Sequence, residues 1–139
     1  MKGKLIAAVL LVMLVLAGCK AGETYPFTQA EEDIAAIELI YVERYEQPSD
    51  YSVLDAVATV EQSQWQESLS RFRQIRCESY FNDPPQGDTG MLIRITYADG
   101  GYEVIGNRCG LYVNPKGQRT YKYYHFEEKA FAALVEAQA

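Results

Sequence analysis

The sequence predicts an α+β fold, with a single antiparallel sheet and two helices packed on one face of it. Three observations carry this prediction. The expected order is strands, a helix, several strands and a final helix, without the βαβ alternation that is typical of parallel sheets. The pair Asp99-Gly100 stands between two alternating runs, which is a strong signal for a β-hairpin. Two segments, one mid-chain and one at the end, carry apolar residues at helical spacing.

The first two expected strands precede the middle helix. Ile34–Tyr45 also has apolar residues at helical spacing, but β-branched and aromatic residues that alternate between two faces predominate, so we expect a strand there. The turn residues Gln47–Asp50 follow. Tyr51–Val60 alternates weakly and is expected to form a second strand, although its apolar spacing also suits a helix.

The middle helix is predicted to begin near Ser63. Ser63 and Gln66 have the spacing of a capping box, in which each side chain satisfies a backbone N–H group at the start of a helix. Trp65, Leu69 and Phe72 follow at intervals of four and three residues, so they lie along one helix face. We expect that face to pack on the sheet.

The clearest hairpin is predicted to have Asp99-Gly100 as a two-residue loop of type I′. This loop places Tyr97 opposite Tyr102 on an apolar face. The other face carries Arg94 and Glu103 as diagonal neighbours that can pair. One face of the sheet is therefore expected to be core, and the other to be wet or weakly covered.

The last strand is expected over Arg119–Phe126, and a helix over Phe126–Ala137 closes the chain. One face of this strand is a candidate binding surface made of Arg119, Tyr121, Tyr123 and His125. Exposed tyrosine suits a sugar or a protein partner, because it offers a large contact area with little entropy to lose. The alternative is that these rings cover the edge of the core, with their hydroxyl groups in water.

The N-terminal residues have the three parts of a secretory signal. Lys2 and Lys4 supply positive charge, and Leu5–Ala17 is an apolar run too short to cross about 30 Å of hydrocarbon as a helix. Small residues then precede a cysteine. The stretch Leu16-Ala17-Gly18-Cys19 resembles the lipobox of bacterial lipoproteins at every position. The resemblance implies that diacylglycerol is attached to the Cys19 thiol and that lipoprotein signal peptidase cuts just before this residue.

We therefore expect residues 1–18 to be a lipoprotein signal peptide, residues 19–29 a lipid-anchored tether and residues 30–139 a single α+β domain. Two or three acyl chains hold a protein stably on a membrane. The expected location is the extracytoplasmic face of the cell membrane, or the outer membrane in a cell with two membranes. The alternative is an ordinary secretory signal with an incidental cysteine.

The mature chain is expected to be acidic. Of the 13 basic residues, Lys2 and Lys4 lie in the signal, which leaves 11 against 19 acidic residues and a net charge near −8. This charge argues against nucleic acid as a partner and against direct adhesion to anionic lipids. We expect the acyl chains at Cys19 to provide the membrane contact.

Two further cysteines, Cys77 and Cys109, form an even pair on the oxidising side of the membrane. A disulfide between them would close a loop of about thirty residues and contribute roughly 3 to 4 kcal/mol of stability. The alternative is two separate buried thiols. Neither arrangement has the closely spaced ligand pairs of a zinc site.

The sequence carries no catalytic or cofactor motif. His125 is the one histidine of the chain, and no nucleophile motif places a serine or cysteine beside it. We therefore expect no cofactor or metal, and a non-enzymatic module that binds an envelope protein or a wall glycan. The alternative is a small envelope hydrolase with converging carboxylates, since glycan cleavage needs two carboxyl groups about 5 to 9 Å apart.

Two stretches of the mature part, Cys77–Pro85 and Tyr97–Glu103, resemble small uncharacterised exported lipoproteins of Gram-positive bacteria. This resemblance implies a cell with one membrane. It carries no known activity, so it adds nothing about mechanism.

Overall fold

The α+β prediction is confirmed by the computed structural model, which describes residues 24–43, 48–79, 88–122 and 124–139. The strands are β1 (Ile34–Val42), β2 (Ala56–Thr59), β3 (Cys77–Ser79), β4 (Gly90–Tyr97), β5 (Tyr102–Ile105), β6 (Gly110–Val113), β7 (Arg119–Lys122) and β8 (Tyr124–Phe126). The helices are α2 (Trp65–Gln74) and α3 (Glu128–Gln138). Short 3₁₀ turns are η1 (Glu31–Asp33), η2 (Tyr51–Val53) and η3 (Gln62–Gln64).

Six strands form one antiparallel sheet in the order β2-β1-β4-β5-β6-β7. Strands β3 and β8 form a separate antiparallel pair. The strand predicted over Arg119–Phe126 is therefore two strands, because β7 belongs to the large sheet and β8 to the small one. Tyr123, between them, lies outside the described residues.

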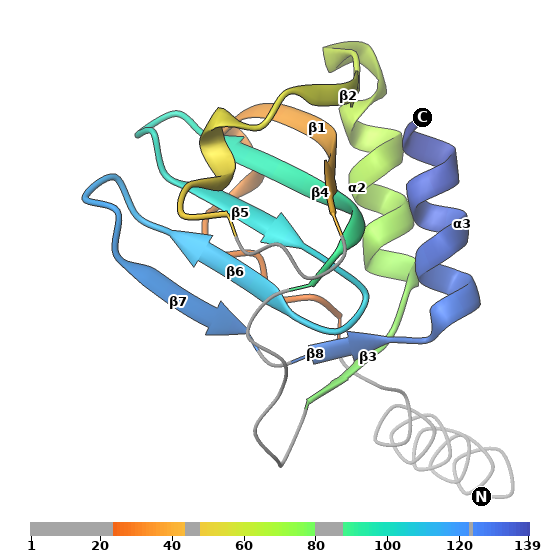
Figure 1. Cartoon of the computed structure of the whole chain (residues 1–139). Coiled ribbons are helices and arrows are strands. Elements are labelled where there is room, and N and C mark those ends of the chain that lie inside the picture. Colours follow the sequence, from red (N-terminus) through yellow and green to blue (C-terminus); the bar gives the residue numbers. More distant parts are fainter. Residues whose placement is uncertain (1–23, 44–47, 80–87, 123) are drawn as a thin grey trace, which may run out of the picture.

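Helices α2 and α3 lie side by side and cover one face of the large sheet (Figure 1). Leu69 and Phe72 of α2 and Phe131 and Leu134 of α3 are buried in the core that the helices share with that face. The apolar stripe predicted for the middle helix is thus the stripe that packs on the sheet. No helix in the described part of the chain is long and apolar enough to cross a bilayer.

The two helices start in different ways. The turn η3 precedes α2, which begins at Trp65 without a side-chain cap, so the predicted capping box of Ser63 and Gln66 is wrong. In contrast, the Glu127 carboxylate accepts hydrogen bonds from two backbone N–H groups in the first turn of α3, at 3.4 and 3.0 Å. A carboxylate at this position satisfies otherwise unpaired donors and complements the helix dipole.

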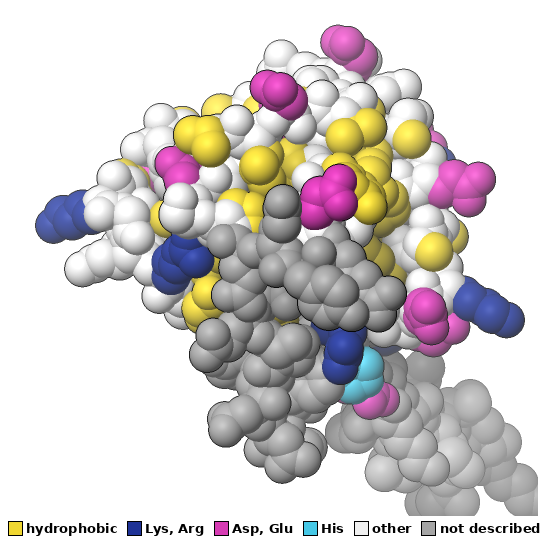
Figure 2. All heavy atoms as spheres, viewed as in Figure 1, with side chains coloured by type: hydrophobic (Ala, Val, Ile, Leu, Met, Phe, Trp, Pro, Cys, Tyr) yellow, Lys and Arg dark blue, Asp and Glu magenta, His cyan; other side chains and the backbone are white. Residues whose placement is uncertain are grey.

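The other face of the sheet is buried as well, under residues 48–54. Turn η2 lies in front of the sheet in Figure 1, and Tyr51 packs there against strands β1, β4, β5 and β6. This face was expected to be wet or weakly covered, but it holds a second buried core. The predicted strand start at Tyr51 is also wrong, since Ala56–Thr59 is the part that pairs as β2. Val53 and Val57 remain exposed, and Figure 2 shows apolar side chains over η2 and β2 with acidic side chains around them.

The β4–β5 hairpin has a three-residue loop instead of the predicted two-residue loop. The Tyr97 N–H group donates to the Gly101 carbonyl at 2.8 Å, which closes the loop one residue earlier than expected. Gly100 takes φ +90°, a conformation that glycine adopts without strain. Tyr97 is consequently not opposite Tyr102. Because side chains alternate between faces, this shift of one residue moves Glu103 to the face beneath the helices.

Glu103 is fully buried in that core (0% exposed). Its carboxylate accepts hydrogen bonds from the hydroxyl groups of Tyr25 (2.7 Å) and Tyr97 (2.6 Å), and it forms an ion pair with Lys122. Burial, together with the negative charge of Glu103, raises the pKa of both tyrosines, so both remain protonated donors. The predicted pairing of Glu103 with Arg94 is wrong, since β4 presents Arg94 on the opposite face.

The N-terminal segment joins the domain earlier than predicted. Tyr25 is buried in the core, and Lys122 Nζ donates to the Pro26 carbonyl. Gly110 makes room for this segment, since a Cβ atom there would lie 2.2 Å from the Tyr25 hydroxyl oxygen. The packed domain therefore includes part of the predicted tether of residues 19–29, whereas the lipobox lies outside the described residues.

Candidate functional site

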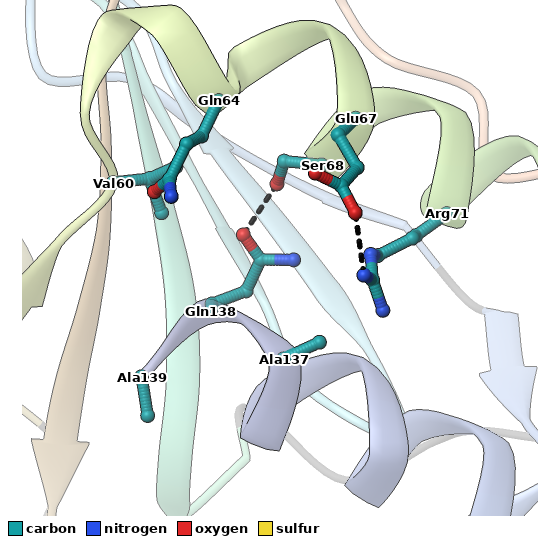
Figure 3. A pocket seen from close by; sticks show the side chains of 8 residues that line it. All are labelled: Val60, Gln64, Glu67, Ser68, Arg71, Ala137, Gln138 and Ala139. Carbon is teal, nitrogen blue, oxygen red and sulfur yellow. Dashed lines mark hydrogen bonds and ion pairs between the residues drawn. The ribbon is translucent and has the colours of Figure 1, made fainter.

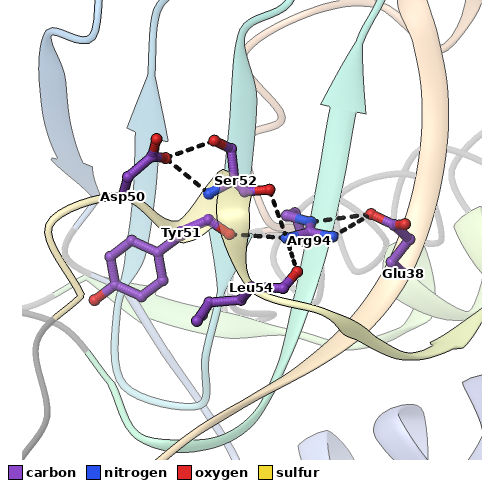
Figure 4. Close-up of polar contacts among 6 residues, drawn as sticks. All are labelled: Glu38, Asp50, Tyr51, Ser52, Leu54 and Arg94. Carbon is purple, nitrogen blue, oxygen red and sulfur yellow. Dashed lines mark hydrogen bonds and ion pairs between the residues drawn. The ribbon is translucent and has the colours of Figure 1, made fainter.

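An arginine on β4 holds residues 50–54 against the face of the sheet opposite the helices, which we name the second face. Arg94 is almost fully buried (6% exposed), and its Nε and Nη2 atoms donate to Glu38 Oε2 at 2.9 and 2.8 Å. Its Nη1 atom donates to the backbone carbonyls of Tyr51 and Leu54, each at 2.8 Å (Figure 4). The planar guanidinium presents these donors in a fixed arrangement, so it positions the segment as well as neutralising the carboxylate.

Asp50 is held at the start of the same segment. Its Oδ1 atom accepts hydrogen bonds from the N–H group (2.9 Å) and hydroxyl (2.6 Å) of Ser52, and from the Tyr102 hydroxyl (3.1 Å). These hydrogen bonds, the one from the Ser52 hydroxyl above all, hold the pKa of Asp50 below its ordinary value. The Asp50 carboxylate is therefore ionised at neutral pH.

Arg119, at the start of β7, reaches the same segment from the edge of the sheet. Its Nη2 atom donates to the Pro48 carbonyl at 3.2 Å and to the Ser49 carbonyl. The guanidinium carbon lies 5.8 Å from the centroid of the Tyr51 ring, which is within the range of a cation–π contact. The Arg119 side chain is thus held by backbone and ring contacts.

These two charged residues border an open cleft of about 300 Å³, which we name the turn cleft. It is lined by Ser49, Asp50, Ser52, Gly100, Tyr102, Val113, Asn114, Pro115, Gly117 and Arg119. The turn between β6 and β7 forms one side of the cleft. Asn114 Oδ1 stabilises this turn by accepting hydrogen bonds from the N–H groups of Lys116 and Gln118 at 2.9 Å each. The cleft presents a carboxylate, a guanidinium and hydroxyl groups that are already held in place, so it is suited to a polar ligand.

The predicted binding surface is divided between the two sheets. Arg119 lines the turn cleft, whereas Tyr121 is half-buried against the core of the second face. His125 lies in β8, where its Nε2 atom is 3.5 Å from Oε2 of Glu78 on β3. Tyr123 lies outside the described residues. Of the predicted surface residues that the structure describes, Arg119 is the one that lines the turn cleft.

Asp50 and Tyr102 of the turn cleft were not predicted from the sequence. Asp50 is typical of a turn, and the sequence has no local signal for its contact with a strand that lies about fifty residues later. The predicted two-residue hairpin loop places Tyr102 on the apolar core face with Tyr97, whereas in the structure it lies on the opposite face. The available signal was Gly101, because a glycine after Asp99-Gly100 also permits the longer loop.

The two further cysteines lie in different parts of the core. Cys77 is 2% exposed and belongs to the core beneath the helices. Cys109 is 3% exposed and lines a small cavity together with residues of the second-face core, such as Leu92 and Leu111. No disulfide joins them in the described part of the chain, and the Cys77–Cys109 bond stays a prediction.

Neither a metal site nor a known relative indicates a function. Within the described residues, no group of three or more His, Cys, Asp or Glu side chains is placed to hold a metal ion. Comparison of the chain with protein-family models, with curated proteins and with solved structures finds no match. The features that bear on function are therefore the N-terminal sequence and the geometry of the clefts.

Proposed function

We propose that this chain is a lipid-anchored protein of the extracytoplasmic membrane face that binds a polar ligand in the turn cleft. The observation that supports binding is the fixed geometry of the cleft, in which Asp50 and Arg119 are each held by at least two hydrogen bonds. Groups that are already positioned lose little conformational entropy when a ligand binds. An envelope protein or a wall glycan offers polar groups of the kind that this cleft complements.

The anchor is supported by the lipobox and by the short distance along the chain from Cys19 to a residue of the core. Tyr25 is buried, and it follows Cys19 by six residues. Six residues span at most about 20 Å when fully extended. A lipid on Cys19 would therefore keep the domain close to the bilayer, and the acidic surface would leave membrane contact to the acyl chains.

A hydrolase is the weaker alternative. Glycan cleavage by paired carboxylates needs two acidic groups on either side of the scissile bond. Among the described residues that line the turn cleft, Asp50 is the one acidic side chain. Asp50 also has a lowered pKa, which suits an ionised binding group better than a proton donor at neutral pH. For these reasons binding is the function that we propose.

Replacing Cys19 with alanine is expected to abolish lipid attachment and maturation. Without the thiol there is no site for diacylglycerol, and the lipobox peptidase has no modified substrate. Intact-mass measurement of the protein from its native cells should find residues 1–18 retained in the variant and a lipid-modified Cys19 at the N-terminus of the wild type. A Cys109→Ala variant, which leaves the lipobox intact, is the control. If Cys19→Ala and Cys109→Ala have equal mature masses and fractionate equally with membranes, the proposed lipid anchor at Cys19 is wrong.

Replacing Arg119 with alanine is expected to weaken ligand capture roughly 10- to 100-fold, because one hydrogen bond from a charged donor contributes about 1.5–3 kcal/mol. The measurement is photo-crosslinking in intact cells from a probe placed at the exposed position Gln118, next to the turn cleft. Arg108→Ala, on an exposed residue that does not line the cleft, is the matched control. Thermal melting of both variants establishes that they remain folded. Cross-linked products that are equally abundant in both variants would contradict binding at this cleft.

A further inference from the structure

A second, smaller pocket lies between the start of α2 and the end of α3, away from the turn cleft. Its volume is about 240 Å³, below the range of about 300–1,000 Å³ for sites that hold drug-sized ligands. Its polar side chains are those of Gln64, Glu67, Ser68, Arg71 and Gln138 (Figure 3). The pocket is therefore sized for one small chemical unit and lined by polar groups.

Gln138 is the feature that distinguishes this pocket from a surface depression. Its side chain is buried, at 7% exposed, and the Ser68 hydroxyl donates to its Oε1 atom. This contact orients the amide so that Nε2 points away from Ser68 and toward the pocket (Figure 3). Among the residues that the structure describes, Nε2 has no hydrogen-bond partner. Buried amide donors are almost always paired in folded proteins, so a donor in this position is suited to an acceptor on a ligand.

Two charged side chains at the rim of this pocket form an ion pair. Arg71 Nη2 lies 2.7 Å from Glu67 Oε1, one helical turn earlier on α2. These are the two charged side chains among the described residues that line the pocket. The pair leaves the rim side chains without net charge, so they supply no excess of positive or negative charge to attract a charged ligand. The pocket therefore favours a neutral ligand with a strong acceptor.

We propose that this pocket binds the secondary amide group of a small uncharged ligand. The amide carbonyl oxygen accepts a hydrogen bond from Gln138 Nε2, which supplies the partner that this donor lacks in the described part of the chain. The amide N–H group and any neighbouring hydroxyl groups are donors, and the Gln64 and Glu67 side chains at the rim offer acceptors for them. Such an amide occurs in the acetamido group of an amino sugar and in a peptide bond.

The pocket lies far from the point where the chain enters the domain. The Tyr25 ring stacks 6.0 Å from Phe126 of β8, and α3 begins directly after β8. The 11 residues of α3 span about 16 Å, which places Gln138 at the other end of the molecule (Figure 1). With the proposed lipid on Cys19, this end would face away from the bilayer. That orientation depends on the anchor, but ligand binding does not.

The test is an NMR titration of the full-length chain in detergent micelles with N-acetylglucosamine, and with glucose as the matched sugar that lacks the amide. N-acetylglucosamine should shift the Gln138 side-chain NH₂ signals and the Ser68 amide, and glucose should leave them unchanged. N-acetylalanine methylamide tests the peptide source. The proposal is supported if at least one of the two amides binds and glucose does not. Which amide binds shows whether the ligand is an amino sugar or a peptide. Equal shifts with glucose, or no shift with either amide, would overturn it.

A variant adds a second criterion. Gln138→Met keeps the length of the side chain and removes the donor, so it should weaken amide binding about tenfold, the effect of losing one hydrogen bond. Gln74→Met, at the exposed end of α2, is the control and should bind as the wild type does. Wild-type affinity in Gln138→Met would contradict the assigned role of Nε2. Because neither readout involves Arg119 or Cys19, failure here leaves the turn cleft and the anchor standing.

Discussion

Replacing Glu103 with glutamine is expected to lower the free energy of unfolding by about 3–5 kcal/mol, the range measured when one partner of a buried ion pair is removed. The variant leaves the Lys122 ammonium in a poorly hydrated site without its carboxylate. It also weakens the acceptor that the hydroxyl groups of Tyr25 and Tyr97 share. Urea unfolding followed by the fluorescence of Trp65 measures the change, provided that the denaturant slope stays constant.

Two further variants make this expectation specific. Glu136→Gln changes an exposed glutamate on α3 and should alter the free energy of unfolding by less than about 0.5 kcal/mol. Glu103→Gln combined with Lys122→Met should be more stable than Glu103→Gln alone, because the stranded charge is removed. A Glu103→Gln variant as stable as Glu136→Gln would mean that the buried carboxylate does not hold the N-terminal segment as its contacts indicate.

The hairpin illustrates which part of the fold local sequence patterns can predict. Both strands and the turn were predicted, because alternating apolar residues around Asp99-Gly100 have few other solutions. The register between the two strands was not predicted. Tyr102–Ile105 carries apolar residues on both of its faces, so the alternation did not select one face for the core. The extra glycine, Gly101, left both loop lengths open.

The burial of Glu103 depends on contacts that no local pattern contains. Tyr25, which donates to it, lies 78 residues earlier in the chain, and Lys122 lies 19 residues later. An isolated glutamate in a strand is normally expected to face water, because an unpaired buried charge is costly. Only the fold assembles the partners that make burial possible. The burial of the second face under residues 48–54 likewise depends on contacts between distant parts of the chain, such as those of Arg94 with Tyr51 and Leu54, so no local pattern predicts it.

The turn cleft was predicted in part for a related reason. Arg119 could be selected because it shares one face of an alternating strand with tyrosines, and both faces of that strand could not be fully buried. Asp50 could not be selected from the sequence, because its role depends on a hydrogen bond from Tyr102, which lies 52 residues away. Gln138 reads as one more polar residue of a helix, and its unpaired donor emerges only when α2 and α3 are packed together.

Replacing Arg94 with methionine is expected to lower the free energy of unfolding by about 3–5 kcal/mol. The guanidinium is almost fully buried, and it serves Glu38 and the carbonyls of Tyr51 and Leu54 at once. Methionine fills much of the space but leaves the carboxylate and the carbonyls without a donor, and each unsatisfied buried group costs about 1–3 kcal/mol. Arg94→Lys should recover only part of the loss, because a single ammonium cannot reproduce the planar fork.

The loss should be concentrated in the segment that Arg94 holds. Arg71→Met removes an arginine that also pairs with a glutamate, but in an exposed pair on one helix, and should cost no more than about 0.5 kcal/mol. In Arg94→Met, residues 50–54 should become accessible to proteases in the still folded protein, and ligand capture at the turn cleft should fall because Asp50 begins that segment. Unchanged protection of this segment would show that the packing of Tyr51 alone holds it, and that the turn cleft is rigid without the arginine.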